Sequence, residues 1–139
     1  MTLIEFHESA AALLPRLFLG ILFISQGYDK AFRVKIRGVV DAYEPPADLH
    51  HISHKALWVS AWFTTAVELL GGLLLFLGLF RYLAMYVLGI DLLLASLAFS
   101  LVRPIWDLKH VFPRILLLTL LLLMPPAWDV ISVDHLLGL

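Results

Sequence analysis

The most informative stretch for the architecture of this chain is residues 56–102, which read ALWVSAWFTTAVELLGGLLLFLGLFRYLAMYVLGIDLLLASLAFSLV. This stretch holds two apolar segments, 56–80 and 82–102, with only Arg81 between them. Each segment reaches the length of about 20 residues that a helix needs to cross the hydrocarbon core of a bilayer. Because the link is so short, we predict that the two segments form an antiparallel pair of transmembrane helices.

Two further apolar segments flank this pair, at 10–32 and at 111–128. Over the whole chain of 139 residues, 61% are hydrophobic and 15% are charged. Soluble domains carry about 45–50% apolar and about 25% charged residues, and a small domain has too much surface to hide the excess inside. The predicted fold class is therefore all-α: one integral membrane domain, residues 1–139, with four transmembrane helices in contact with the lipid bilayer.

Composition also excludes several classes of function. The net charge is −1, and there is no basic patch or glycine-rich phosphate loop, so nucleic acid is not an expected partner. The chain has no cysteine, which excludes disulfides, thiolate metal sites and thiol redox chemistry by its own residues. A redox role would therefore need a bound cofactor or a partner protein. The first residues include Glu5, His7 and Glu8 instead of a positively charged leader, so we expect the first apolar segment to be retained.

The loop between the first two spans, residues 33–55, contains a predicted interfacial helix. Its apolar residues recur at helical spacing, with charged residues on the other faces. This pattern is typical of an amphipathic helix that lies in the headgroup region of a membrane. We predict this helix over residues 34–44, ended by Pro45 and Pro46. Its apolar face consists of Ile36, Val39, Val40 and Tyr43.

Positive charge is distributed unevenly between the two ends of the predicted bundle. Of the ten lysines and arginines, all but Arg16 and Arg81 lie in or beside the loops 33–55 and 103–110. Cytoplasmic loops of membrane proteins are enriched in these residues. We therefore expect both loops to lie in the cytoplasm and both termini to lie on the opposite side of the membrane.

Two acidic residues lie inside the predicted spans. Inserting a charged side chain at the centre of a membrane helix costs roughly 2.5–3.5 kcal/mol, so such a residue indicates a structural or functional role. Glu68 is 13 positions before Arg81, and Asp91 is 10 positions after it. At about 1.5 Å per residue, their heights in the hairpin differ by only ~5 Å. Two carboxylates at one depth share either a proton or a cation.

The first span supplies candidate partners for these carboxylates. Arg16 and Lys30 lie on one stripe of the helix, with Gln26 beside them and with glycines that let a neighbouring helix approach closely. We expect the first three spans to turn these groups inward and to form a pocket around Arg16, Glu68 and Asp91. The fourth span is expected to cover this pocket from the lipid side.

Three interpretations of the predicted pocket remain open. The charges form a structural pair that fixes the helix register, or they bind a small lipophile such as a quinone head group, or they form a proton path. In the ligand-binding interpretation, Arg16 and Lys30 balance charge or donate hydrogen bonds, and Gln26 holds a carbonyl oxygen. Glu68 accepts or relays a proton, which Asp91 orients or shares.

The histidines of the first loop form a weak candidate metal site. His50 and His54 are four residues apart, a spacing that can bind zinc or copper on a helix, and His51 is adjacent. Histidine is also ordinary at a membrane interface, and no metal signature surrounds these residues, so we predict no metal. The third loop, 103–110, is expected to be an interface-anchored turn, with a docking surface or a lid as the alternative.

Several segments of the chain resemble the DoxX-like family of small membrane proteins. The run ELLGGLLLFLGLFR at 68–81 is similar to that family's central motif. Residues 16–20 and 26–30 are similar to the opening of family members, and residues 128–134 are similar to their C-terminal end. The resemblance implies a four-helix bundle in a bacterial inner membrane, where the charge distribution puts both termini in the periplasm. Members are similar to the membrane subunit of thiosulfate:quinone oxidoreductase or accompany membrane redox complexes, and more distantly the family resembles the sigma-2 receptor group, which binds lipophilic ligands.

The resemblance favours a membrane subunit of a quinone-linked redox complex that handles sulfur compounds, thiols or oxidative stress. The chain has no self-contained catalytic motif, so an oxidoreductase role would depend on protein partners or on a homo-oligomer. One alternative is a non-catalytic scaffold or assembly factor, which would be insensitive to Glu68→Gln. A second alternative is a small transporter that acts as an oligomer, although no broken helix of the kind that builds transport sites is evident.

Overall fold

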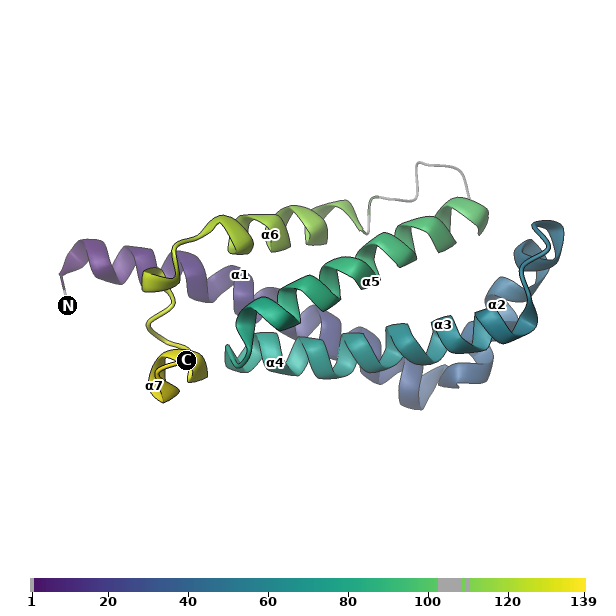
Figure 1. The fold of residues 1–139 in the computed structure, drawn as a ribbon, viewed down its shortest axis with the longest axis horizontal. Coiled ribbons are helices and arrows are strands. Elements are labelled where there is room, and N and C mark those ends of the chain that lie inside the picture. Colours follow the sequence, from purple (N-terminus) through teal and green to yellow (C-terminus); the bar gives the residue numbers. More distant parts are fainter. Residues whose placement is uncertain (1, 103–108, 110) are drawn as a thin grey trace.

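The structure is a computed structural model that describes residues 2–102, 109 and 111–139. These residues form helices and the turns between them, and they contain no strand, so the all-α fold class is confirmed (Figure 1). The helical stretches long and apolar enough to cross a membrane are Leu3–Arg33, His54–Leu77 and Arg81–Ser100, with the shorter apolar helix Phe112–Leu123 as a fourth member of the bundle.

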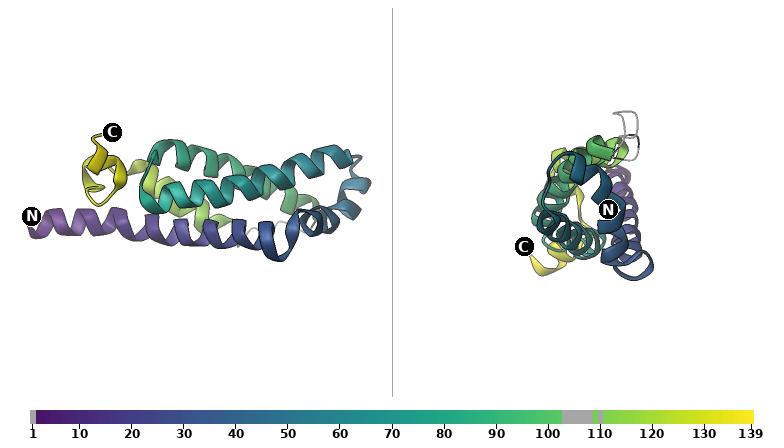
Figure 2. Two further views of the ribbon diagram at one scale, coloured as in Figure 1. Left: turned by 90° about the horizontal axis from the view of Figure 1, so that it is seen from below. Right: turned by 90° about the vertical axis from the view of Figure 1, so that its right-hand side faces the viewer.

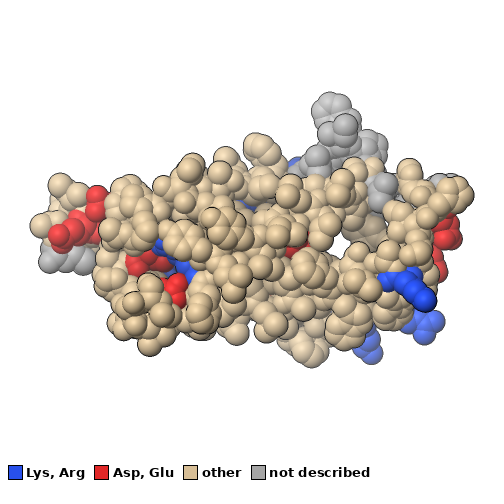
Figure 3. Space-filling model, viewed as in Figure 1, with Lys and Arg blue, Asp and Glu red and all other residues tan. Residues whose placement is uncertain are grey.

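On the face that Figure 3 shows, the surface between the two ends of the bundle carries few charged side chains. Large side chains are more than half exposed there, among them Phe18 at 54%, Ile90 at 52% and Leu93 at 58%. Water-soluble monomers rarely expose such extensive apolar patches. The protein is therefore an integral membrane protein whose middle zone faces lipid.

The first helix, α1 (Leu3–Tyr28), begins earlier than residue 10, where the apolar segment starts. The Thr2 side chain accepts a hydrogen bond from the Glu5 backbone N–H, and the Glu5 carboxylate accepts one from the Thr2 N–H. This capping box satisfies the free N–H groups of the first turn and extends the helix beyond the membrane zone. The helix then continues into a π-helical segment, η1 (Asp29–Arg33), and runs along most of the bundle (Figure 2).

The second helical stretch is continuous and consists of α3 (His54–Ala66), a π-helical segment η2 (Val67–Gly71) and α4 (Gly72–Leu77). It ends at Gly78, whose φ of 67° places it in the left-handed region. This conformation turns the chain into α5 (Arg81–Val102) and confirms the predicted antiparallel pair. Arg81, which we expected to be the link, is the first residue of α5.

Glycines bring α1 into close contact with the second helical stretch. A Cβ on Gly20 would lie 2.7 Å from the Cβ of Phe76, and one on Gly27 would lie 2.5 Å from the backbone nitrogen of Leu69. Real Cβ atoms do not approach other atoms so closely, so side chains are excluded at both positions. The predicted small-residue packing between these helices is confirmed.

The interfacial helix α2 spans Lys35–Leu49 and continues through both prolines instead of ending before them. Pro45 and Pro46 offer no N–H to the carbonyls four residues earlier, but those carbonyls belong to exposed residues that water can reach. The helix ends where His51 adopts a φ of 54° and the Ile52 N–H bonds to the Ala47 carbonyl at 2.9 Å. The predicted apolar face packs against the first half of α3, where the buried contacts are Ile36, Val40 and Ala61.

The last apolar segment forms a helix only over α6 (Phe112–Leu123), instead of continuing to residue 128. Met124 is extended, with φ −72° and ψ 136°, because a residue that precedes a proline disfavours the helical region. At about 1.5 Å per residue, α6 is ~18 Å long and shorter than a bilayer core of about 30 Å. The chain then forms a 3-10 turn, η4 (Pro126–Trp128), and a short final helix, α7 (Val133–Leu137), at the same end as the α4–α5 turn.

Candidate functional site

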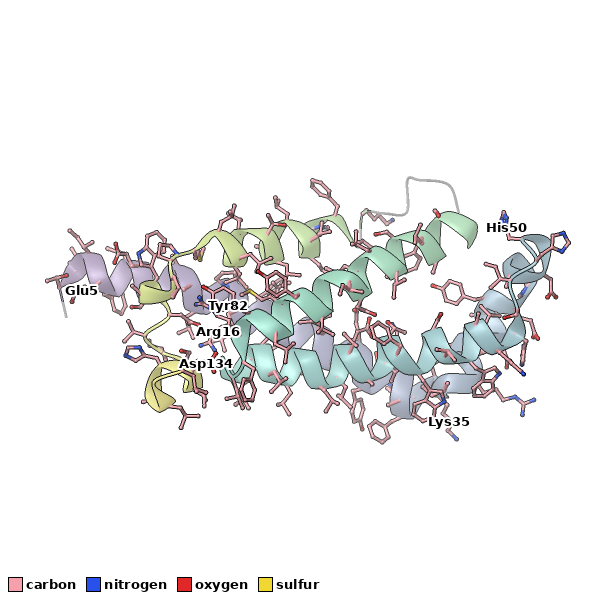
Figure 4. The ribbon with its side chains drawn as sticks, in the orientation of Figure 1. Glu5, Arg16, Lys35, His50, Tyr82 and Asp134 are labelled. Carbon is pink, nitrogen blue, oxygen red and sulfur yellow. The ribbon has the colours of Figure 1, made fainter. Side chains whose placement is uncertain are left out.

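The structure places the buried charges in two separate clusters at different heights in the bundle. The inner cluster lies towards the α2 end and contains Gln26, Lys30, Thr64, Glu68, Asp91 and Arg114. The terminal cluster lies at the α4–α5 turn and contains Arg16, Arg81, Asp129 and Asp134. Figure 4 shows Arg16, Tyr82 and Asp134 together at that end, with Lys35 and His50 at the other end.

The principal ion pair of the inner cluster joins two π-helical segments. The Lys30 Nζ atom, from η1, donates to the Glu68 Oε1 atom, from η2, at 2.8 Å and to the Thr64 hydroxyl at 3.2 Å. A π-helical turn contains an extra residue and shifts the face on which its side chains lie, and such turns occur frequently at functional sites. Lys30 is 27% exposed and Glu68 is 6% exposed, so the pair is largely shielded from solvent.

Arg114 extends the inner cluster from the fourth helix. Its NH1 group donates to the Gln26 Oε1 atom at 2.9 Å, and its charge acts on both Glu68 and Asp91. The fourth helix therefore contributes a charge to the site in addition to covering it. The inner cluster therefore contains two basic and two acidic side chains.

Asp91 is fully buried, and neither of its carboxylate oxygens has a hydrogen-bond partner among the described residues. The Thr64 side chain lies close enough to this carboxylate to interact with it as a hydrogen-bond donor would, outside the geometry of a regular hydrogen bond. The second oxygen of Glu68, Oε2, is also buried and lacks a donor within the described part of the chain. The inner cluster therefore contains three acceptor atoms that a bound molecule, water or a proton could satisfy.

A cavity of about 430 Å³ opens beside the inner cluster. Its walls come from α2, α3, α5 and the ends of α1 and α6 that face the interfacial helix, and most of its lining is apolar. Figure 3 shows the hollow between α5 and α3 on one face of the molecule. The polar side chains that line the cavity include Gln26, Lys30, Tyr43, Thr64, Glu68 and Arg114.

Tyr43 brings a hydroxyl group to the cavity from α2, outside the membrane-spanning helices. Burial, followed by the negative charge of Glu68, raises the pKa of the Tyr43 phenol above its ordinary value. The phenol therefore remains a hydrogen-bond donor at neutral pH. We predicted Tyr43 only as part of the apolar face of this helix, and the structure shows that it also lines the cavity within range of the Glu68 charge.

The terminal cluster corrects the prediction that Arg16 shares a pocket with Glu68 and Asp91. The Arg16 guanidinium donates to the backbone carbonyls of Leu75, Phe76 and Ile131. Its Nε atom lies 3.4 Å from the Asp129 carboxylate. Arg16 and Lys30 are 14 residues apart, which places them ~21 Å apart along one helix at about 1.5 Å per residue, so they cannot serve the same site.

Asp129 and Asp134 fasten the C-terminal segment to the α4–α5 turn. The Asp129 Oδ2 atom accepts from the Arg81 NH1 group at 3.1 Å, so one carboxylate pairs with two buried guanidiniums. Asp134 accepts from the backbone N–H groups of Phe80 and Arg81 at 2.8 and 2.9 Å, and it caps the start of α5. These contacts hold the C-terminal segment against the α4–α5 turn, so the terminal cluster has a structural role.

We did not predict Arg114 as a site residue, because we counted it among the charges of the third loop. One signal was available, since Pro113 is favoured in the first turn of a helix and therefore places Arg114 inside the apolar segment. Asp129 offered no comparable signal, because its partners are far away in the sequence. Its pairing depends on how the chain end folds back.

The histidines of the first loop lie near the surface at the α2 end. His50 and His51 are exposed, while His54 accepts a hydrogen bond from the Trp58 Nε1 at 2.9 Å and pairs with Glu44 at 3.2 Å. Within residues 2–102, 109 and 111–139, no three histidine or acidic side chains converge as metal ligands would. Of the third loop, 103–110, only Lys109 is among the described residues, so its predicted role lies outside them.

Comparison with known proteins identifies the family. The DoxX family model matches residues 11–101, which include most of α1 and α5, all of α2 to α4 and therefore most of the cavity wall. No curated protein and no solved structure matches the chain. The match covers more than half of the sequence and includes the central motif at 68–81, so the chain belongs to the DoxX family of membrane proteins.

Proposed function

We propose that this protein is a membrane subunit of a quinone-linked redox complex and that its cavity holds the head group of a quinone or a quinone-like lipophile. The apolar cavity of about 430 Å³ with a charged inner end carries this proposal. Small-molecule sites have volumes of about 300–1,000 Å³, are mostly apolar and contain a few convergent polar groups. A lipophile in the surrounding bilayer would reach such a cavity without crossing water.

The residues of the inner cluster suit the proton chemistry of a quinone. Reduction of a quinone to a hydroquinone consumes two electrons and two protons. In this proposal, Glu68 exchanges protons with the head group and Asp91 orients or shares them, Lys30 balances charge, and Gln26 with Arg114 holds the far oxygen. The chain has no cysteine, so in this proposal the electrons come from a bound cofactor or from a partner protein.

We also propose that the α2 end faces the cytoplasm of a bacterium, with both termini in the periplasm. Arg33 is 74% exposed at this end, and Lys35, Arg37 and Lys55 are exposed beside it. This excess of positive charge follows the distribution of inner-membrane proteins. A C-terminal alkaline phosphatase fusion should therefore be active and a C-terminal green fluorescent protein fusion dark, and the opposite result would reverse the orientation.

Glu68→Gln tests the proposed site, because it removes the acid while keeping the size of the side chain. In membranes that contain the native complex, quinone-coupled turnover should fall by at least about tenfold, since a positioned proton-transfer group contributes about 10²–10⁴-fold. Glu8→Gln is the matched control, because Glu8 is only half buried and lies near the N-terminus. A second variant, Lys30→Gln with Glu68→Gln, avoids leaving an unpaired buried ammonium.

Full turnover in both Glu68 variants, with normal protein levels in the membrane, would overturn the proposal. Loss of turnover only after changes to the exposed face of α2 would instead favour the scaffold function. Binding of a soluble quinone analogue to the purified protein gives an independent measurement, because it does not need the partner that supplies electrons.

A further inference from the structure

We propose that the ligand of the cavity carries an apolar chain, and that this chain leaves the cavity between α3 and α5 and lies among the acyl chains of the bilayer. This inference rests on the proposed function and adds where the part of the ligand beyond the head group lies. The observation behind it is that the charged residues and the exposed residues of the cavity wall come from different elements.

Five residues line the cavity and are also exposed at the surface of the bundle. A residue that faces both a cavity and its surroundings forms the rim of an opening. All five lie on α3 or α5, which border the hollow in Figure 3, and four of them are apolar. They are Ala56, Ser60, Phe63, Leu94 and Leu97. The cavity therefore opens sideways, between these two helices.

The packing of α5 shows that α6 does not close this opening. A Cβ on Gly89 would lie 3.6 Å from the Leu118 side chain of α6, so this side of α5 faces α6. Leu94 is five positions further on, which at 3.6 residues per turn is about 140° around the helix. The edge of α5 that borders the opening therefore points away from α6.

The opening lies at the depth of the hydrocarbon core. Leu94 and Leu97 are 13 and 16 positions after Arg81. At about 1.5 Å per residue, they are ~20 and ~24 Å from the α4–α5 turn, whereas the core of a bilayer is about 30 Å thick. With the turn at one boundary of the core, the opening faces acyl chains in the half of the membrane nearer to α2. An apolar chain can lie there, but a polar group would lose its hydrogen bonds to water.

The charged part of the cavity wall lies on other elements and suits a polar head group. Lys30, Glu68 and Arg114 come from η1, η2 and α6, and none of them is exposed. Asp29, which also lines the cavity, has a side chain that is 49% exposed and pairs with Arg33 at 3.1 Å, so a chain that left there would pass an ion pair. A molecule with a polar head and an apolar chain matches both the charged wall and the apolar opening.

The test compares two quinones that differ only in the chain, on the purified full-length protein in lipid nanodiscs. One is a benzoquinone with a decyl chain, and the other has a methyl group in place of that chain. Equilibrium dialysis gives both affinities, and protein-free nanodiscs of the same lipid correct for the partition of each probe into the bilayer. Ser60→Trp places a large side chain in the opening. It should weaken binding of the decyl probe by at least about tenfold, or about 1.4 kcal/mol, while the methyl probe keeps its wild-type affinity.

Val59→Trp is the matched control. Val59 is the neighbouring residue on α3, is 68% exposed and is not among the residues that line the cavity. Both probes should bind this variant as they bind the wild-type protein.

A second measurement needs no substitution. A decyl probe with a diazirine on a chain carbon near the ring is irradiated in the wild-type protein, and the labelled peptides are identified by mass spectrometry. The labels should fall on α3 and α5, within residues 56–63 and 94–97.

Two results would overturn the inference and leave the proposed head-group site intact. One is that Ser60→Trp weakens binding of both probes equally or of neither. The other is that the diazirine labels α1 or α6 instead of α3 and α5. Failure of both probes to bind the wild-type protein would remove the proposed function together with this inference.

Discussion

Replacing Asp129→Asn should destabilise the protein strongly without touching the cavity. Asp129 is 5% exposed and pairs with Arg16 and Arg81, which are 2% and 8% exposed. The substitution keeps the shape of the side chain but removes the one carboxylate that lies between two buried guanidiniums. Removing one partner of a buried ion pair costs about 3–5 kcal/mol, because the remaining charge stays buried and uncompensated.

We expect the lower end of this range. Arg16 keeps three backbone carbonyl acceptors in the variant, and Arg81 keeps the Tyr82 hydroxyl at 2.9 Å. A loss of about 3 kcal/mol corresponds to a fall of about 10 °C in the melting temperature for a chain of this size. The protein contains four tryptophans, and Trp128 adjoins the substituted residue, so tryptophan fluorescence in detergent micelles is a suitable measurement.

Two further variants test whether the loss of stability comes from the buried ion pairs of Asp129. Asp41→Asn makes the same chemical change at an exposed position and should shift the melting temperature by little. In a protein that already carries Arg81→Leu, Asp129→Asn should lower the free energy of unfolding by distinctly less, because one of the two guanidiniums that would lose their carboxylate partner is already absent. A melting temperature within about 2 °C of wild type for Asp129→Asn alone would refute the structural role assigned to the terminal cluster.

Three further predictions concern other parts of the structure. Gly27→Ala should lower the free energy of unfolding by about 1–3 kcal/mol through overpacking, because its Cβ would lie 2.5 Å from a backbone nitrogen. Gly89→Ala is the control and should be tolerated in the same melting experiment, because the nearest atom to its Cβ would lie at 3.6 Å. Asp134→Ala should cost about 1 kcal/mol through loss of the α5 cap, and Asp134→Asn should recover much of it. Because burial raises the pKa of Tyr43, the unfolded chain loses that proton first as the pH rises above about 10, so stability should fall there. Tyr43→Phe should weaken this alkaline loss, and an unchanged pH profile would contradict the buried position of the phenol.

Much of the fold could be predicted from local patterns. The lengths of the apolar segments indicated a helical membrane protein, and the short link at Arg81 indicated an antiparallel pair. The spacing of Ile36, Val40 and Tyr43 indicated an amphipathic helix, whose apolar face packs against α3 in the structure. These predictions succeeded because hydrophobic length and helical periodicity depend only on neighbours within a few turns of the chain.

The candidate site was predicted only in part, for an identifiable reason. The positions of Glu68 and Asp91 on either side of one turn set them at similar heights, and the structure brings their charges within range of each other. We placed Arg16 in the same pocket because Arg16 and Lys30 lie on the same stripe of α1, and only Lys30 pairs with Glu68. The two π-helical segments, which aim Lys30 and Glu68 at each other, were not visible in the periodicity.

Composition and periodicity alone showed that this chain is helical, crosses a membrane and buries charges within its spans, since both are local properties of the chain. Only the tertiary structure assigned those charges to partners. Asp129 reaches Arg16 across more than a hundred residues of chain, and Arg114 reaches Gln26 from the fourth helix. Such pairings depend on the packing of whole helices and on the return of the C-terminal segment, which no short stretch of sequence specifies.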